Sequence, residues 1–216
     1  MLGLTYLLSN AFSGPVAPIT EALLKHGAIV DAVDSTGANL LHQAALNNDM
    51  MPNDLRALLA LPKVHGVIDG IRNMPRTWLW KLIFKVARLA YRRGTSSGFL
   101  IAVAQWQGAT PLHLAVLTCH ADTMAVLVES GADVGVRNGQ GHTPLELAGL
   151  VWGGGLAPGL KFKERKRIAK EGEVPAVVRE ALTPNYSDVS DDVVQRVYSL
   201  ATRRVGRGLL SLGQLL

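Results

Sequence analysis

Residues Thr110–Ala148 read TPLHLAVLTCHADTMAVLVESGADVGVRNGQGHTPLELA, and the stretch begins to repeat itself before it ends. The tripeptide Thr-Pro-Leu at Thr110 recurs at Thr143, an offset of 33 residues. A fixed offset of this kind is typical of stacked repeat proteins, in which each unit contacts only its neighbours. Thr followed by Pro also begins a helix well, because the hydroxyl accepts an unpaired backbone N–H and Pro needs no donor at the first helical position.

A second helix and a turn complete this unit. Met124, Leu127 and Val128 give the second helix an apolar face, and Ser130–Gly131 ends it, since Gly adopts the left-handed conformation without strain. Asn138–Gly139 is a tight-turn signal. We expect Gly131→Val to destabilise the fold far more than Gly139→Ala, because a β-branched residue is strained in the left-handed conformation whereas a turn tip can relax. With its TPLH start, its SGADV end and its period, the stretch resembles an ankyrin repeat.

The resemblance implies an all-α solenoid of four to five helix–helix–turn units, the first, third and last of them irregular. Residues 19–70 fit it, with a helix end at Gly27 and a new unit at Asn39. Residues 71–104 keep the phase, because Thr77 precedes Thr110 by 33 residues, yet they lack a break where the turn between two helices belongs. This segment is either a degenerate third repeat or a helical insertion that fills one repeat slot.

Residues 1–155 are predicted to form the solenoid, and residues 156–216 a separate C-terminal segment. The repeat pattern of the fifth unit is lost at Leu150–Gly155. The glycines of this stretch predict a flexible break in place of a second helix. Helical patterns resume at Lys161–Lys170, Val174–Leu182 and Val193–Ala201. These helices most simply cap the end of the last repeat. The alternative is a mobile basic tail.

Composition bounds the class of protein. Hydrophobic residues make up 48% of the 216 residues, which excludes an intrinsically disordered chain. The net charge of +5 is segmental, since residues 71–107 hold seven Lys or Arg and no acidic residue. The apolar start of the chain lacks a positive n-region and is interpreted as an irregular first helix rather than a signal peptide. No apolar run is long enough to span a membrane.

The single cysteine, Cys119, excludes an internal disulfide framework and fits a reducing compartment. We therefore expect an intracellular, cytoplasmic protein. The basic cluster Lys161–Arg167 adds the nucleus as an alternative, although solvated helix charge explains the cluster more simply.

Few residues suggest chemistry. Five of the six histidines fall on recurring positions of the repeat, so no metal site is expected. The stretch Gly154–Lys161 fails as a phosphate-binding loop, because Leu160 separates the second Gly from the Lys. Cys119 and His120 are adjacent on a turn and lack a third catalytic group. The sequence predicts a protein that is not an enzyme and has no cofactor.

One helix has an unusual surface. In Arg76–Arg93, four basic residues fall within about 60° of one another at 100° per residue, while apolar residues occupy most of the remaining circumference. The simpler interpretation is a core helix wedged into the stack, whose Lys and Arg side chains extend to the surface so that their charged ends reach water. The alternative is a peripheral helix that contacts an anionic membrane or an acidic surface. Its contact residues would be Lys81, Lys85, Arg88 and Arg92.

The ankyrin resemblance implies a scaffold that binds an unidentified partner protein through its turn tips and the concave face of its first helices. No specific nucleic-acid binding is expected. Trp106 is the strongest single candidate, because an exposed Trp dominates interface energetics; packing against the irregular third segment is the alternative. The positions carried over from the family pattern are Ser35, Thr36, Ala38, Leu46, Asn47, Trp106, Gln107, Ala109, Leu117, Thr118, Gly139, Gln140 and His142.

Overall fold

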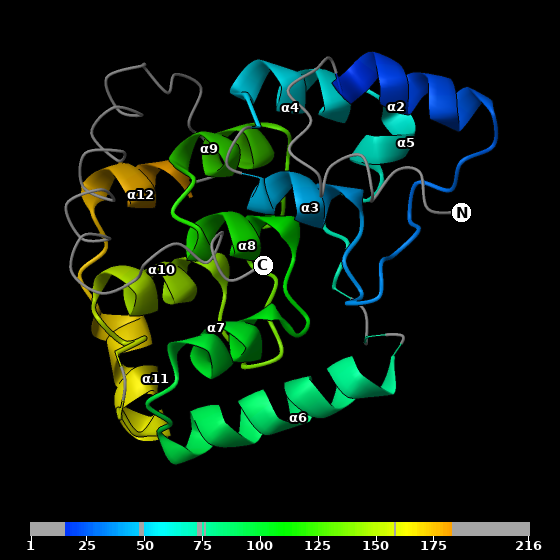
Figure 1. Cartoon of the computed structure of the whole chain (residues 1–216). Coiled ribbons are helices and arrows are strands. Elements are labelled where there is room, and N and C mark those ends of the chain that lie inside the picture. The colour runs from blue at the N-terminus through cyan, green and yellow to red at the C-terminus, as the bar shows by residue number, and fades with distance from the viewer. Residues whose placement is uncertain (1–15, 48–49, 73–74, 76, 158, 183–216) are drawn as a thin grey trace.

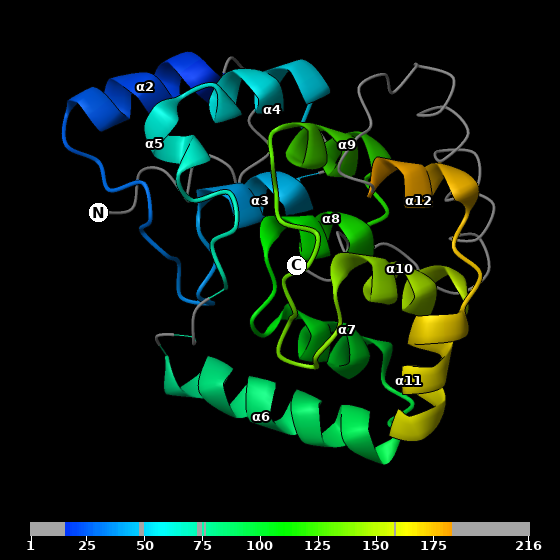
Figure 2. The ribbon, with the colours of Figure 1, turned by 180° about the vertical axis from the view of Figure 1, so that it is seen from behind.

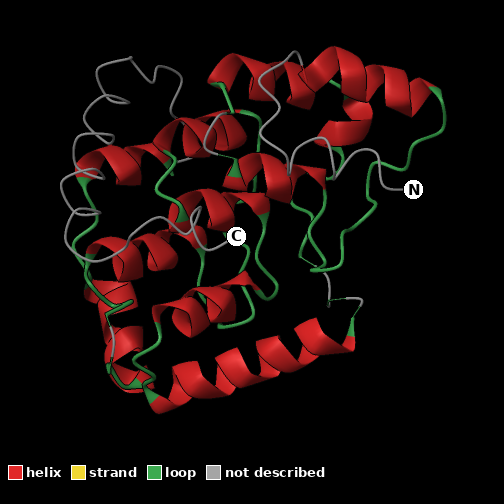
Figure 3. Cartoon of the chain, in the orientation of Figure 1, coloured by secondary structure: helices red, strands yellow, loops and turns green. Residues whose placement is uncertain are grey.

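A computed structural model describes residues 16–182, apart from 48–49, 73–74, 76 and 158. Within these residues the secondary structure is helical and contains no strand (Figure 3). The last helix predicted from the sequence, at Val193–Ala201, lies outside the described residues. The helices are α2 (Val16–Lys25), α3 (Leu40–Leu46), α4 (Pro52–Leu59), α5 (Pro62–His65), α6 (Trp78–Arg93), α7 (Gly98–Trp106), α8 (Pro111–Leu117), α9 (Ala121–Glu129), α10 (Pro144–Trp152), α11 (Phe162–Glu171) and α12 (Ala176–Ala181).

The repeat helices form two layers. The first helices of successive units, α3, α8 and α10, pack side by side in one layer. In the second layer α2 contacts α4, α4 contacts α9, and α9 contacts α12 (Figures 1 and 2). Helices this short gain little from propensity alone, so their stability comes from the core between the layers. The fold is an all-α solenoid, as the sequence predicted.

Each first helix begins at the capping motif that the sequence indicated. The side chains of Thr110 and Thr143 accept the backbone N–H of the third helical residue, and Pro follows each of them. Asn39 caps α3 in the same way without a following Pro. In all three helices the side chain of the third helical residue accepts a hydrogen bond from the backbone N–H of the N-cap residue. This second bond completes a capping box.

Residues 71–104 do not continue the stack. The first helix α3 lies directly against α8, although the whole segment separates them in the sequence. The backbone N–H of Arg72 donates to the carbonyl of Ala109 over 2.8 Å, so the chain leaves and re-enters the stack at one place. Between these points α6 and α7 form a helical hairpin at the edge of the stack (Figures 1 and 2). These contacts favour the helical-insertion alternative over a degenerate repeat within the stack.

A glycine turn breaks the insertion into two helices, which the sequence reasoning did not anticipate. Gly94 has a φ of +86° and ends α6. Thr95 then donates to the carbonyl of Ala90, and Ser97 caps α7 through its side chain. Phe84, Ala87 and Tyr91 form the buried face of α6. The prediction of a core helix wedged into the stack is therefore wrong, because most of α6 faces outward.

The glycine-rich stretch after α10 is packed rather than open. Helix α11 lies on α10 so closely that a Cβ added at Gly149 would come within 2.7 Å of the carbonyl oxygen of Ala169. The buried side chain of Arg165 donates to the carbonyls of Gly155, Ala157 and Leu160 and so holds the connecting loop. The expected flexible break at Leu150–Gly155 is not what the structure shows.

Candidate protein-binding surface

Two turns, at residues 34–38 and 138–142, precede the first helices α3 and α10, and a polar side chain holds each of them. The carboxylate of Asp34 accepts the backbone N–H groups of Thr36 and Ala38, at 2.7 and 3.0 Å. The amide oxygen of Asn138 accepts those of Gln140 and His142, at 3.0 and 3.1 Å. Each turn also closes by a backbone bond from the first residue to the carbonyl four residues on. The turns are therefore fixed by local bonds before any partner arrives.

A second set of bonds joins neighbouring units through buried histidines. The Nε2 of His42 lies 2.9 Å from the carbonyl oxygen of Ala109, and that of His113 lies 2.9 Å from the carbonyl oxygen of His142. In both rings Nδ1 accepts the N–H of the helix cap, so Nε2 carries the proton and donates it. Burial lowers the pKa of each ring to about 4. Both histidines are thus neutral and structural near pH 7, as their position in the repeat predicted.

The inserted hairpin covers part of the turn-tip side. The side chain of Gln140 donates to the carbonyl of Ala104 at the end of α7, and that of Asn138 donates to Gln105 Oε1 over 3.1 Å. The N–H of Gly139 donates to the carbonyl of Gln107 over 2.7 Å. The turn at 138–142 is therefore packed against α7 instead of projecting into solvent.

Trp106 is part of this packing and is not an exposed turn-tip residue. Its side chain is 2% exposed. The guanidinium of Arg72 lies 4.8 Å from the centre of its ring, and the same guanidinium donates to the Thr36 carbonyl. Burial lowers the pKa of Arg72 only to about 10, so the group stays charged and contributes a cation–π contact. The expectation of an accessible Trp106 fails for this reason.

The other predicted contact positions divide by exposure. Ala38, Ala109, Leu117, Gln140 and His142 are buried, because they lie between units or beneath the hairpin. Ser35 and Gly139 are exposed, and Thr36, Leu46, Asn47, Gln107 and Thr118 are partly exposed. The hydroxyl of Thr118 lies 3.4 Å from the carbonyl oxygen of Ala45, which brings the ends of α8 and α3 together. Apart from Gln107 and Gly139, which lie at the end of α7, the accessible candidates are found at the turn of residues 34–38 and at the C-terminal ends of α3 and α8.

The Cys119–His120 pair is not arranged as a nucleophile and its base. Burial raises the pKa of the Cys119 thiol to about 11, so the thiol stays protonated near neutral pH. The Nδ1 of His120 lies 3.3 Å from the carbonyl oxygen of Ala45. Cys119 itself has a φ of +60°, the turn conformation that usually requires Gly. Among the described residues no group of three or more His, Cys, Asp or Glu could hold a metal ion.

The four basic residues predicted as a surface-contact set share one side of α6. Lys81, Lys85, Arg88 and Arg92 are all exposed. Next to them lies a row of exposed apolar side chains: Trp78, Leu79, Leu82, Val86 and Leu89. Of the helices that the structure describes, none has both the length and the apolar character to cross a membrane.

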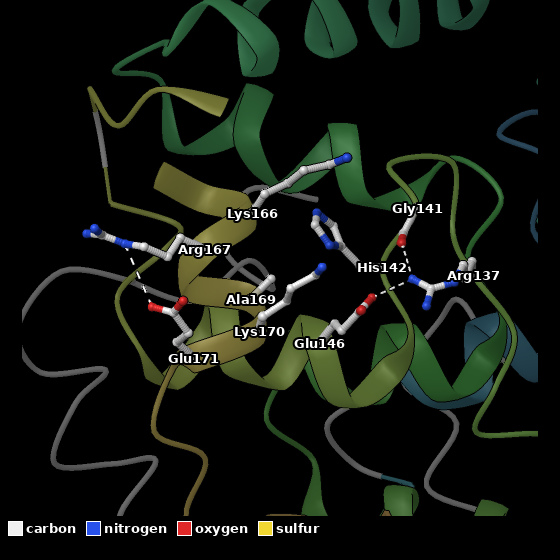
Figure 4. A pocket seen from close by; sticks show the side chains of 9 residues that line it. All are labelled: Arg137, Gly141, His142, Glu146, Lys166, Arg167, Ala169, Lys170 and Glu171. Carbon is white, nitrogen blue, oxygen red and sulfur yellow. Dashed lines mark hydrogen bonds and ion pairs between the residues drawn. The ribbon is translucent and has the colours of Figure 1, made fainter. Parts of the chain in front are cut away.

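A cavity of about 440 Å³ lies where the turn at 138–142 meets α11 (Figure 4). His142 lies in its wall, and Lys166 and Lys170 extend from α11 toward that ring. The two carboxylates at the cavity are paired, Glu146 with Arg137 at 2.7 Å and Glu171 with Arg167 at 3.9 Å. Lys166 and Lys170 therefore give the cavity lining a net positive charge. The lining contains no Ser, Thr or Cys that could act as a nucleophile.

Comparison with known proteins agrees with this geometry. The family model for the ankyrin repeat matches residues 107–139, which span α8, α9 and the following turn. Residues 107–139 therefore form a repeat of the ankyrin family. The match stops short of the insertion and of the C-terminal helices, so the number of ankyrin units rests on the helix contacts described above.

Two curated proteins are similar to parts of this ankyrin-repeat chain. A mitochondrial disaggregase from Bos taurus is 34% identical over 154 residues, which are 69% of this chain and 22% of that protein. An ankyrin repeat-containing protein from Schizosaccharomyces pombe is 43% identical over 49 residues, 23% of this chain and 24% of that protein. The similarity thus spans about a quarter or less of the length of each curated relative.

Sequence reasoning missed the residues that rigidify the surface. Asp34 could have been found, because Asp34-Ser-Thr-Gly37 and Asn138-Gly-Gln-Gly141 share a polar residue three positions before a Gly. Both of these glycines have a φ of +84°. Arg72 and Arg165 carry no comparable signal, since buried and exposed arginines look alike in a sequence.

Proposed function

We propose that this chain is a non-catalytic module that binds a partner protein through the turn of residues 34–38, which precedes α3, and through the C-terminal ends of α3 and α8. Supporting this, the turn is held by Asp34, which bonds two backbone N–H groups and the Thr36 hydroxyl. A loop fixed before binding loses little conformational entropy on association, and so more of its contact energy appears as affinity.

The proposed surface is smaller than the family pattern suggests. It comprises Ser35, Thr36, Leu46, Asn47 and Thr118, with Gln107 at its edge. The turn of the fifth unit is left out because the inserted hairpin covers it. Since several modest contacts replace a buried Trp anchor, we expect single substitutions to reduce affinity in small steps of about 1 kcal/mol.

The two curated relatives support only a general inference about this chain. The bovine relative is named a disaggregase and a mitochondrial protein, and the matched segment is a fraction of it. We infer that the segment serves as a binding element within such larger proteins, separate from their chemistry. An intracellular location remains a prediction.

The proposal is tested by site-specific photo-crosslinking on the full chain in a cell extract. A photoreactive residue placed at Ser35 or Leu46 is expected to crosslink the same partner. The matched control is Lys63, an exposed site on α5 away from this surface. Equal capture of that partner from Lys63 would contradict the proposal. The proposal would also be wrong if Leu46→Ala and Thr118→Ala both bound the purified partner with the affinity of the unchanged chain.

A further inference from the structure

Among the described residues, five of the nine large apolar side chains that are exposed lie on α6, and the partner-binding role does not use them. Trp78, Leu79, Leu82, Val86 and Leu89 are 46% to 74% exposed, with Trp78 the most exposed. At 100° per residue these five side chains project within about 100° of one another, opposite the buried Phe84, Ala87 and Tyr91. Clustered apolar exposure of this kind marks an interaction surface rather than ordinary surface variation.

The charged residues beside this apolar row are all basic. Lys81, Lys85, Arg88 and Arg92 lie along one flank of the apolar row, Arg93 follows, and α6 contains no acidic residue. No carboxylate among the described residues forms an ion pair with any of these five cations. A surface that covers the apolar row therefore meets five positive charges, which favours an anionic partner.

The position of α6 suits a flat partner. Figures 1 and 2 show α6 along one edge of the described structure, with α7 and α11 on its inner side. The helix is held from within, since Tyr91 packs edge-on against Phe162 and the guanidinium of Arg165 covers its ring. The outer face is a straight row of side chains and not a groove. A planar surface can reach its full length without meeting the repeats.

We propose that α6 docks the chain on the surface of an anionic lipid bilayer. The apolar row inserts at the boundary between headgroups and acyl chains, and the basic flank lies level with the lipid phosphates. Trp78 suits that depth, because its ring is apolar and its indole N–H can reach water or a headgroup. A second copy of the chain is the weaker occupant, since paired α6 faces would bring five cations from each copy together without an acidic residue to offset them.

Vesicle co-sedimentation of the full chain tests the proposal, with phosphatidylglycerol-containing vesicles compared with pure phosphatidylcholine. Binding to the anionic vesicles alone is expected. Lys81→Ser/Lys85→Ser should lower the partition coefficient on the order of 20-fold, because each basic side chain near an anionic surface contributes about fivefold. The matched control is Lys25→Ser/Lys63→Ser, which removes the same charge from exposed sites off α6 and should bind almost as well as the unchanged chain.

Tryptophan fluorescence reports the insertion itself. The unchanged chain should shift its emission to shorter wavelength on anionic vesicles, and Trp78→Phe should bind but lose most of that shift. Trp106 and Trp152 are buried already, and Trp80 is half-buried beside Phe84 on the other side of α6 from the apolar row. Leu82→Ser/Val86→Ser, both at exposed sites, should fold by circular dichroism yet fail to sediment with vesicles. No sedimentation of the unchanged chain, equal binding to neutral vesicles, or equal loss in the two lysine variants would overturn the proposal. A lipid-free dimer that Leu82→Ser converts to a monomer would also overturn it.

Discussion

At the scale of single residues, Trp106 shows how burial changes the role of a side chain. A Trp beside a turn was expected to contact a partner, yet here it supports Arg72 at the point where the hairpin joins the stack. We predict that Trp106→Ala lowers the free energy of unfolding by about 3–5 kcal/mol, because it leaves a cavity in a packed core. Urea denaturation measures this change, with the neighbouring, partly exposed Gln107→Ala as control. Equal stability of the two variants would contradict the assignment.

Two glycines that looked unequal from the sequence are both required, for different reasons. A Cβ at Gly139 would lie 2.7 Å from the carbonyl oxygen of Gln107, so the turn would have to move off α7. Gly131 has open space around it but a φ of +89°, and Ala there costs about 1 kcal/mol in strain. The expectation that the turn tip at Gly139 relaxes freely is therefore wrong.

We predict that Gly139→Ala and Gly131→Ala each lower the melting temperature by several degrees, since about 1 kcal/mol corresponds to roughly 2–4 °C in a chain of this size. The control is Gly98→Ala at the start of α7, where the added Cβ meets nothing within 4 Å and φ is not positive. That variant should match or exceed the unchanged chain, because Ala favours the helix. A Gly139→Ala protein as stable as Gly98→Ala would show that the close approach to Gln107 is absent.

At the scale of elements, the sequence specified the paired helices better than the insertion. TPLH, the helix-ending glycines and the 33-residue period act through local geometry, so they predicted α8, α9 and α10 and the structural role of the histidines. The insertion keeps the 33-residue spacing without forming a unit of the stack, and its turn at Gly94 was overlooked because the apolar pattern of α6 continues up to that glycine. The binding surface was harder still, since the covering of Gln140 and His142 depends on where α7 packs. No local pattern encodes that placement.

The buried histidines that join the units also predict acid sensitivity. For His42 and His113 the folded pKa of about 4 lies below the unfolded value near 6.5. Their contribution is fully present above pH 6.5 and is lost as the pH falls toward 4, because the unfolded chain takes up protons that the folded chain refuses. Between pH 7.5 and pH 5 we expect a loss on the order of 2 kcal/mol per ring.

Urea denaturation at a series of pH values measures this loss. His113→Gln should be less stable at pH 7.5 and should show a shallower decline toward pH 5, since one titrating ring is gone. The control is His26→Gln, a substitution of an exposed ring at the end of α2. Identical pH slopes for His113→Gln and the unchanged chain would mean that His113 does not stay neutral in the folded state.

At the scale of the whole molecule, the hairpin leaves and re-enters the stack at one place, and it also packs on the turn at 138–142 and on α11. The bond between Arg72 and Ala109 places the two ends of the insertion side by side, and α3 already lies against α8 without it. We predict that replacing residues 73–106 by a short Gly-Ser linker leaves a helical, monomeric stack that unfolds cooperatively. It should be less stable than the full chain by a few kcal/mol, because the cover over the turn at 138–142 is removed.

The same deletion distinguishes the two proposed surfaces. A stack without α6 should still capture the partner crosslinked from Ser35, because Asp34 fixes that turn from within its own unit. It should no longer sediment with anionic vesicles, because the apolar row and its basic flank are gone. Circular dichroism, ultracentrifugation and the two binding assays on one preparation measure all of these outcomes. An unfolded deletion protein would instead make the hairpin an integral part of the solenoid core, and retained vesicle binding would place the lipid contact elsewhere in the chain.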